Sequence, residues 1–130
     1  MRAISLGFTS GHCLVVDEEG KKKVYGFGHS EKGQVGYGGT INQYLPIDIT
    51  HQFPDEVVQI SAGAYHTLAL LADGRLFGWG KGSRGQLGYK YIKEVNTNHL
   101  KNPAEIKISE EPVKIASIAS GSLYTLAQIY

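Results

Sequence analysis

Two stretches of the chain repeat the same glycine-rich sequence at a constant distance. The first reads Gly-Phe-Gly at 26–28 and Gly-Gln-Val-Gly-Tyr at 33–37. The second reads Gly-Trp-Gly at 78–80 and Gly-Gln-Leu-Gly-Tyr at 85–89, so every matching position lies 52 residues later. An internal repeat of about 50 residues is typical of solenoids, propellers and other repeat arrays. Such a repeat indicates how a chain is built and says little about what it binds.

Each repeat contains short segments in which large apolar residues alternate with smaller ones, as they do in β-strands. In the second copy, apolar residues from His66 are followed by the hairpin signal Asp-Gly and by an apolar, aromatic stretch that ends at Gly80. The first copy runs in the same way from His12 to Gly28, and the turn glycine follows the histidine by eight residues in both copies. Two further strands per copy are expected at 46–49 and 57–62, and at 103–108 and 113–119. Four short antiparallel strands per repeat predict a β-propeller blade.

The predicted fold class is all-β, a partial β-propeller of two four-stranded antiparallel blades plus one flanking strand at each end. We expect a single propeller segment over residues 1–130, in which a third copy of the repeat begins near Gly121. The expected first blade covers about 12–62 and the second about 66–119, with stray strands at 2–7 and 124–130.

The order of these motifs resembles the repeat of the regulator of chromosome condensation family. The matching pattern is Ile-x-x-Gly-x-x-His-Thr-Leu-Ala-Leu, then Asp-Gly, Gly-Trp-Gly and Gly-Gln-Leu-Gly, and it covers essentially the whole chain. The resemblance implies a seven-bladed propeller. Kelch repeats have a similar period but carry a Gly-Gly pair in each copy, whereas Gly38-Gly39 has no counterpart after Tyr89.

Residues that recur in each copy are expected to be structural, because catalytic residues do not usually repeat with the fold. The histidine position tolerates tyrosine in the third copy, and the single tryptophan has Phe27 as its counterpart. The expected structural repeat positions are His12, His66, Tyr124, Gly28, Gly80, Gly36, Gly88 and Trp79.

The sequence predicts neither an enzyme active site nor a cofactor or metal site. Residues 80–85 match the dinucleotide fingerprint GxGxxG, but the turn-rich sequence after them does not open the helix that this fingerprint needs. The histidines show no metal-ligand spacing with one another or with Cys13.

Charge and cysteine content limit the expected partners and compartment. The net charge of +1 is too small to favour nucleic acid by charge alone, and no apolar run approaches the length of a membrane span. Cys13 is the only cysteine, so an intrachain disulfide cannot form. We therefore expect an intracellular protein, cytoplasmic or nuclear, with no membrane contact and with nucleic-acid binding unlikely for this segment.

The loop between the second glycine motif and Pro103 is longer than its counterpart before Pro46. Loops on a rigid scaffold often carry binding specificity, although a tolerated surface insertion is the alternative. The candidate partner-binding residues of this loop are Tyr91, Lys93, Glu94, His99 and Lys101.

Two blades alone would leave strand edges and apolar faces in water. We therefore expect the remaining blades to come from the same protein, from another chain or from identical copies. The predicted function is a non-enzymatic β-propeller scaffold for protein–protein interaction, within a larger propeller or complex. The alternatives are a guanine-nucleotide exchange factor for a small GTPase, which the family resemblance implies, a structural component of a ciliary or chromatin assembly, and an enzyme-inhibitor propeller.

Overall fold

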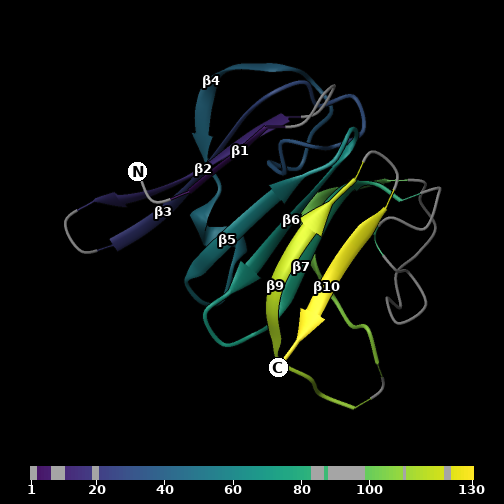
Figure 1. Ribbon diagram of the computed structural model, residues 1–130. Helices are drawn as coiled ribbons and strands as arrows, with labels where there is room; N and C mark the ends of the chain where they lie inside the picture. Colours follow the sequence, from purple (N-terminus) through teal and green to yellow (C-terminus); the bar gives the residue numbers. More distant parts are fainter. Residues whose placement is uncertain are drawn as a thin grey trace.

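The computed structural model consists almost entirely of antiparallel β-sheet (Figure 1). It describes residues 3–6, 11–18, 21–82, 87, 99–109, 111–121 and 124–130. The first sheet has the order β1 (Ala3–Leu6), β2 (Gly11–Glu18), β3 (Lys21–Gly28) and β4 (Gln43–Asp48). The second has the order β5 (Val57–Ala62), β6 (His66–Leu71), β7 (Leu76–Lys81) and β8 (His99–Ile106). The third pairs β9 (Ile115–Ser120) with β10 (Thr125–Ile129), and a 3-10 turn, η1 (Thr50–Gln52), precedes β5.

The expected all-β fold with two four-stranded antiparallel sheets is confirmed, but the expected strand grouping is wrong by one strand. Residues 2–7 were expected to form a stray strand, whereas β1 pairs with β2 and opens the first sheet. Likewise, β5 opens the second sheet by pairing with β6 and does not close the first. The third sheet has two described strands, where one was expected at 124–130.

Short connections account for how the first two sheets begin. Four residues separate β1 from β2 and three separate β5 from β6. Connections as short as these favour antiparallel pairing of the two strands that they join, whereas β3 and β4 pair across the longer segment between Gly28 and Gln43. The sheets therefore comprise residues 3–48, 57–106 and 115–129, in place of blades at 12–62 and 66–119. That residues 1–130 form one propeller segment stays a prediction.

The strand register also corrects the alignment of His12. Thr67 lies opposite Trp79 in the second sheet, whereas His12 lies opposite Phe27 in the first. Because Phe27 is the counterpart of Trp79, His12 takes the position of Thr67 and not that of His66. The first hairpin is longer on both sides of its turn, so counting back from the turn glycine selects the wrong residue.

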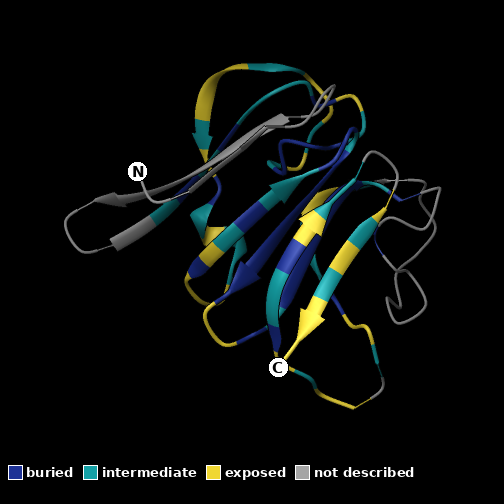
Figure 2. Cartoon of the chain, in the orientation of Figure 1, coloured by how far each residue is buried: buried dark blue, intermediate teal, exposed yellow. Residues whose placement is uncertain are grey.

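The sheets pack side by side, with β6 and β7 in the middle. β5 lies against β1 and β2, and β9 lies against β5 and β6. Every residue of β6 is buried, as the dark blue ribbon in Figure 2 shows. One apolar cluster, which includes Val24, Ile49 and Trp79, joins the first two sheets. A second cluster, which includes Leu68 and Ile118, joins the second sheet to the third.

The glycine-rich loop after β3 fastens the first sheet to the second. The backbone carbonyl of Gln34 accepts hydrogen bonds from Trp79 Nε1 at 2.7 Å and from Thr67 Oγ1 at 3.1 Å. All three residues are fully buried. Gly36 has a φ of +85°, and a Cβ on it would lie 2.8 Å from Trp79 Nε1. The repeated glycine therefore serves both the turn and the close approach of the indole.

The same loop also covers a glycine in its own sheet. A Cβ on Gly26 of β3 would lie 2.5 Å from the carbonyl oxygen of Val35. In the second sheet, a Cβ on Gly78 would lie 2.9 Å from Leu87 Cδ2. Leu87 of the second glycine-rich motif thus packs on Gly78, as Val35 of the first packs on Gly26.

Replacing Gly36 with alanine should destabilise the fold more than the same change at Gly38. Both glycines have positive φ, and this backbone strain costs about 1 kcal/mol for alanine. At Gly38 the nearest atom to a new Cβ is Asn102 Oδ1 at 3.1 Å, on an exposed side chain. At Gly36 the buried indole must also move, which raises the expected loss in free energy of unfolding to about 2–4 kcal/mol. Urea unfolding of both variants measures the difference, and equal losses would contradict the packing role of Trp79.

Candidate functional site

His66, one of the expected structural repeat positions, lies at the contact between the second and third sheets. It is fully buried on β6, and its Nε2 lies 3.2 Å from Thr125 Oγ1 on β10. A Cβ on Gly63 would collide with its ring, so glycine is needed beside it. The imidazole therefore joins two sheets.

Burial lowers the pKa of His66 to about 4, and a hydrogen bond with the backbone of Tyr124 opposes this shift. The ring is consequently uncharged at neutral pH. A neutral, enclosed imidazole that contacts a threonine hydroxyl is suited to holding the two sheets together, and the structural role expected for this position stays a prediction.

The predicted partner-binding loop is not assembled into a described site. Tyr91, Lys93 and Glu94 lie outside the described residues. His99 begins β8. Lys101 is exposed on β8, and its backbone carbonyl accepts a hydrogen bond from the Gly38 N–H at 3.1 Å. The partner-binding role of this loop stays a prediction.

Two of the other repeat positions have backbone conformations that favour glycine, and a third is exposed. Gly28 and Gly80 have φ values of 104° and 95°, which favour glycine. Tyr124 is exposed, unlike its counterpart His66. Gly88 lies outside the described residues.

Sequence reasoning missed an exposed apolar surface on the first sheet. Ile41, Tyr44 and Leu45 are 75%, 91% and 77% exposed, and we call these three side chains the β4 patch. Figure 2 shows β4 with its exposed stretch in yellow at the outer edge of the sheet. A signal was available in the comparison of the two copies, because Tyr-Leu-Pro at 44–46 aligns with Lys-Asn-Pro at 101–103.

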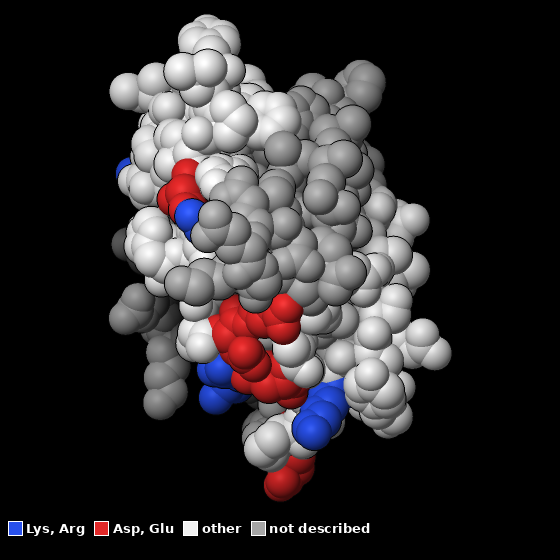
Figure 3. Space-filling model, turned by 90° about the vertical axis from the view of Figure 1, so that its left-hand side faces the viewer, with Lys and Arg blue, Asp and Glu red and all other residues white. Residues whose placement is uncertain are grey.

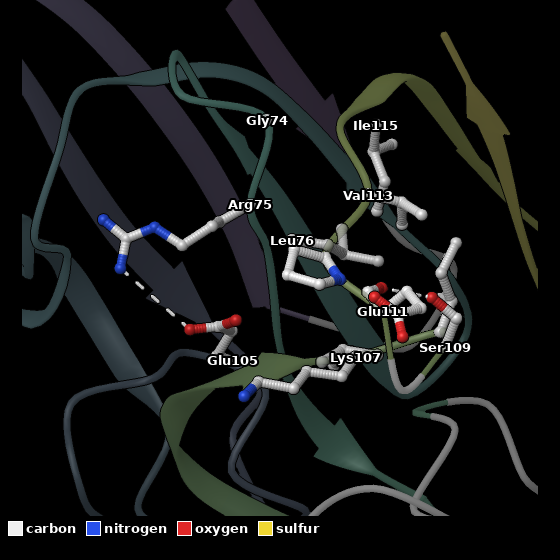
Figure 4. A pocket seen from close by; sticks show the side chains of 12 residues that line it. Gly74, Arg75, Leu76, Glu105, Lys107, Ser109, Glu111, Val113 and Ile115 are labelled. Atoms are coloured by element: carbon white, nitrogen blue, oxygen red, sulfur yellow. Dashed lines mark hydrogen bonds and ion pairs between the residues drawn. The ribbon is translucent and has the colours of Figure 1, made fainter.

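A groove of about 240 Å³ lies beside the β6–β7 turn and the end of β8 (Figure 4). The buried side chains of Leu76, Ile106 and Ile115 contribute to its lining. At its rim Arg75 lies 4.0 Å from Glu105, and it also pairs with Asp73 at 2.7 Å. The groove offers an apolar floor and a rim of both charge signs.

Charges of both signs also mix on the face of the molecule shown in Figure 3. Acidic side chains gather in its lower half, and lysine or arginine atoms lie next to them. Such mixing gives no strong field of one sign over that face.

Among the described residues, no three His, Cys, Asp or Glu side chains gather as they would around a metal ion. Nor does the described part of the chain contain a helix long and apolar enough to cross a membrane.

Lowering the pH should destabilise the fold through His66. Its folded pKa of about 4 lies below the ordinary 6.5, so the unfolded chain takes up a proton that the folded chain resists. The stabilisation is complete above pH 6.5 and is lost as the pH falls towards 4, with a total of about 3 kcal/mol. Urea unfolding at pH 7 and pH 4.5 should therefore show a larger loss for the wild type than for His66→Gln. The exposed-site control His51→Gln should keep the wild-type dependence, and an unchanged dependence in His66→Gln would refute this assignment.

Known proteins similar to this chain share its repeat. The chain is 42% identical to the Ultraviolet-B receptor UVR8 of Arabidopsis thaliana over 79 residues, which cover 59% of the chain and 17% of that protein. It is 31% identical to Protein RCC2 of Homo sapiens over 126 residues, which cover 97% of the chain and 23% of that protein. The chain thus spans less than a quarter of the length of these relatives.

Solved structures share the fold. The crystal structure of human WBSCR16 matches with a TM-score of 0.76 and 24% identity, over 92% of this chain and 28% of that one. Yeast RCC1 (Prp20), in a crystal structure with Kap60, matches with a TM-score of 0.72 and 22% identity, over 96% of this chain and 29% of that one.

The pattern of the Regulator of chromosome condensation (RCC1) repeat matches residues 22–70 and 73–128, and a second pattern of the same repeat matches residues 57–86. The chain belongs to the RCC1 repeat family.

Proposed function

We propose that the chain is a non-enzymatic β-propeller segment that binds another protein and works within a larger propeller or complex. The β4 patch carries this proposal. Its three large apolar side chains are each at least three-quarters exposed, on or just before a single edge strand. Soluble proteins seldom leave neighbouring large apolar side chains in water unless the surface meets a partner.

Tyr37 holds part of the patch in place before any partner arrives. Its hydroxyl accepts a hydrogen bond from the Ile41 N–H at 2.9 Å and donates one to the Ile41 carbonyl at 2.8 Å. Both bonds fix the backbone on which the exposed isoleucine side chain is presented. A surface that is already ordered loses less entropy on binding.

The second sheet shows that the fold does not need apolar residues at this place. Lys101 and Asn102 stand where the first sheet has Tyr44 and Leu45, and both are exposed. Asn102 accepts a hydrogen bond from Gln52 Nε2 at 3.0 Å. Because polar residues serve the same strand position, the apolar pair is better explained by binding than by folding.

Pro46 favours recognition through side chains over addition of a partner strand. Proline lacks a backbone N–H and interrupts pairing along a sheet edge. The exposed aromatic side chain of Tyr44 is instead suited to fill an apolar pocket of the partner, since buried aromatic side chains commonly dominate the energy of protein interfaces.

The relatives support a protein-binding role and leave its details open. Yeast RCC1 is bound to Kap60 in the matched structure, so one relative with this fold binds a protein. Guanine-nucleotide exchange and a structural role in a ciliary or chromatin assembly stay predictions, as does an intracellular location in cytoplasm or nucleus.

Charged substitutions in the β4 patch should abolish partner binding and leave the fold intact. In quantitative affinity purification from cells that make the protein, Tyr44→Lys with Leu45→Lys should reduce specific partners at least about tenfold, because a charge cannot enter an apolar pocket without loss of hydration. Thermal unfolding should change little, because both side chains are exposed.

The matched control places a charge at the equivalent position of the other sheet. Asn102→Lys, which corresponds to Leu45→Lys and leaves the predicted binding residue Lys101 unchanged, should retain the partners of the wild type. An unaltered set of partners in the β4-patch variant, measured at equal protein levels, would refute the proposed role of the patch.

A further inference from the structure

The turn between β6 and β7 contains the sequence Asp73-Gly74, whose backbone is chemically reactive. The amide nitrogen that follows an aspartate can attack the side-chain carboxyl, and glycine permits this readily because it has no side chain to obstruct the ring that forms. Hydrolysis of that ring gives isoaspartate, in which the main chain runs through the side chain. Between β2 and β3 the corresponding sequence is Glu19-Gly20, where glutamate would have to close a larger and less readily formed ring.

The reaction needs the nitrogen of Gly74, and the turn already engages it. The Gly74 N–H donates a hydrogen bond to the Leu71 carbonyl at 3.0 Å. The Leu71 N–H in turn donates to the Arg75 carbonyl at 2.9 Å, which closes the hairpin around this bond. Gly74 is buried, with a φ of 90°. Attack on the Asp73 carboxyl therefore requires a hydrogen bond of the folded turn to break first.

The reaction also needs a carboxyl group that can lose an oxygen, and Arg75 binds both oxygens of Asp73. Oδ1 accepts a hydrogen bond from the Arg75 backbone N–H at 3.0 Å. Oδ2 accepts one from Nε at 2.7 Å and lies 2.7 Å from Nη2. Burial alone would raise the pKa of this carboxyl, but the bonds and charge of Arg75 lower it below its ordinary value. The group is thus kept ionised, and a carboxylate is a poor target for a nucleophile.

Arg75 is itself held in position by a second carboxylate. Its Nη1 lies 4.0 Å from Oε1 of Glu105 on β8, and Figure 4 shows the two side chains facing each other. The side chains of Arg75 and Glu105 are 39% and 35% exposed, so both are partly enclosed by the fold. A planar guanidinium that is held in this way is preorganised to bind the oxygens of Asp73.

We propose that Asp73-Gly74 is an isoaspartate-forming site and that Arg75 keeps it unreactive in the folded protein. In the suppressed reaction the carboxylate first takes up a proton from solvent. The Gly74 nitrogen then bonds to Asp73 Cγ, and its proton leaves with the carboxyl OH as water. Water next adds to the main-chain carbonyl carbon of Asp73, the bond from that carbon to the Gly74 nitrogen breaks, and the main chain continues through Cγ.

The site lies where isomerisation would disturb the contact between sheets. The Gly74 carbonyl accepts a hydrogen bond from the Ile115 N–H of β9 at 3.0 Å, and the Ala72 N–H donates to the Glu56 carbonyl at 2.8 Å. Isoaspartate adds a carbon atom to the main chain of the turn, so Gly74 can no longer keep its bonds to Leu71 and Ile115 together. Arg75 therefore protects the joint between the second and third sheets, a role separate from the β4 patch.

Isoaspartate formation in the intact chain tests the role of Arg75. The chains are incubated at neutral pH, at a temperature at which urea unfolding shows each to be folded. Isoaspartate is then labelled by an isoaspartyl methyltransferase and located by peptide mapping. Arg75→Gln should form isoaspartate at Asp73 at least about tenfold faster than the wild type, because hydrogen bonds from a charged donor are lost. Asp73→Glu should remove the signal.

Lys114→Gln is the matched control for the loss of a positive charge beside the turn. A Cβ on Gly74 would lie 2.9 Å from Lys114 Cβ, which glutamine retains. Among the described residues, Lys114 makes no ion pair with Asp73. This variant should therefore form isoaspartate at the rate of the wild type.

A peptide of residues 71–77 separates the folded turn from its local sequence without any change to the chain. The free peptide should isomerise at least about tenfold faster than the folded wild type, because an isolated hairpin is marginally stable at best. Replacing the arginine of the peptide with glutamine should change its rate less than about twofold, since the folded contacts are absent. Equal rates in the peptide and the folded wild type would overturn the proposal. So would a folded Arg75→Gln chain no faster than the wild type, or an equal effect of glutamine in peptide and chain.

Discussion

The hydrogen bond from Trp79 to the Gln34 carbonyl is the contact on which the arrangement of the first two sheets depends. It brings a loop of one sheet into the buried face of the next, and Thr67 binds the same oxygen. The loop reaches this depth only because Gly36 leaves room for the indole. A buried carbonyl needs such donors, so the tryptophan, the threonine and the glycine must occur together.

This arrangement restricts where the chain can carry function. His66, the repeated side chain that is most typical of a catalytic residue, is enclosed between two sheets and uses its ring to contact Thr125. What differs between copies lies at the surface, where Tyr44 and Leu45 replace Lys101 and Asn102. A repeat protein of this type can therefore vary its partners without altering the contacts that hold its sheets together.

The repeat was sufficient to predict the all-β class and the four-stranded sheets, because its glycine motifs and hairpin signals recur at a constant distance. The repeat could not assign residues 2–7 to a sheet. Their similarity to residues 57–62 indicates that the two segments form equivalent strands, but it does not indicate whether such a strand begins one sheet or ends the sheet before it. His12 was misaligned because the hairpin differs in length. The β4 patch could not be predicted with the same ease, because the longer loop with its polar residues is the more conspicuous difference between the copies and the exposure of an apolar side chain depends on the whole fold.

The glycine-rich segments stabilise individual sheets, and the first of them also joins two sheets. Val35 packs on Gly26 of its own sheet and Leu87 packs on Gly78 of the second, where a side chain in place of either glycine would collide. The carbonyl of Gln34, in the first segment, in addition accepts the hydrogen bond from Trp79 that fastens its sheet to the next.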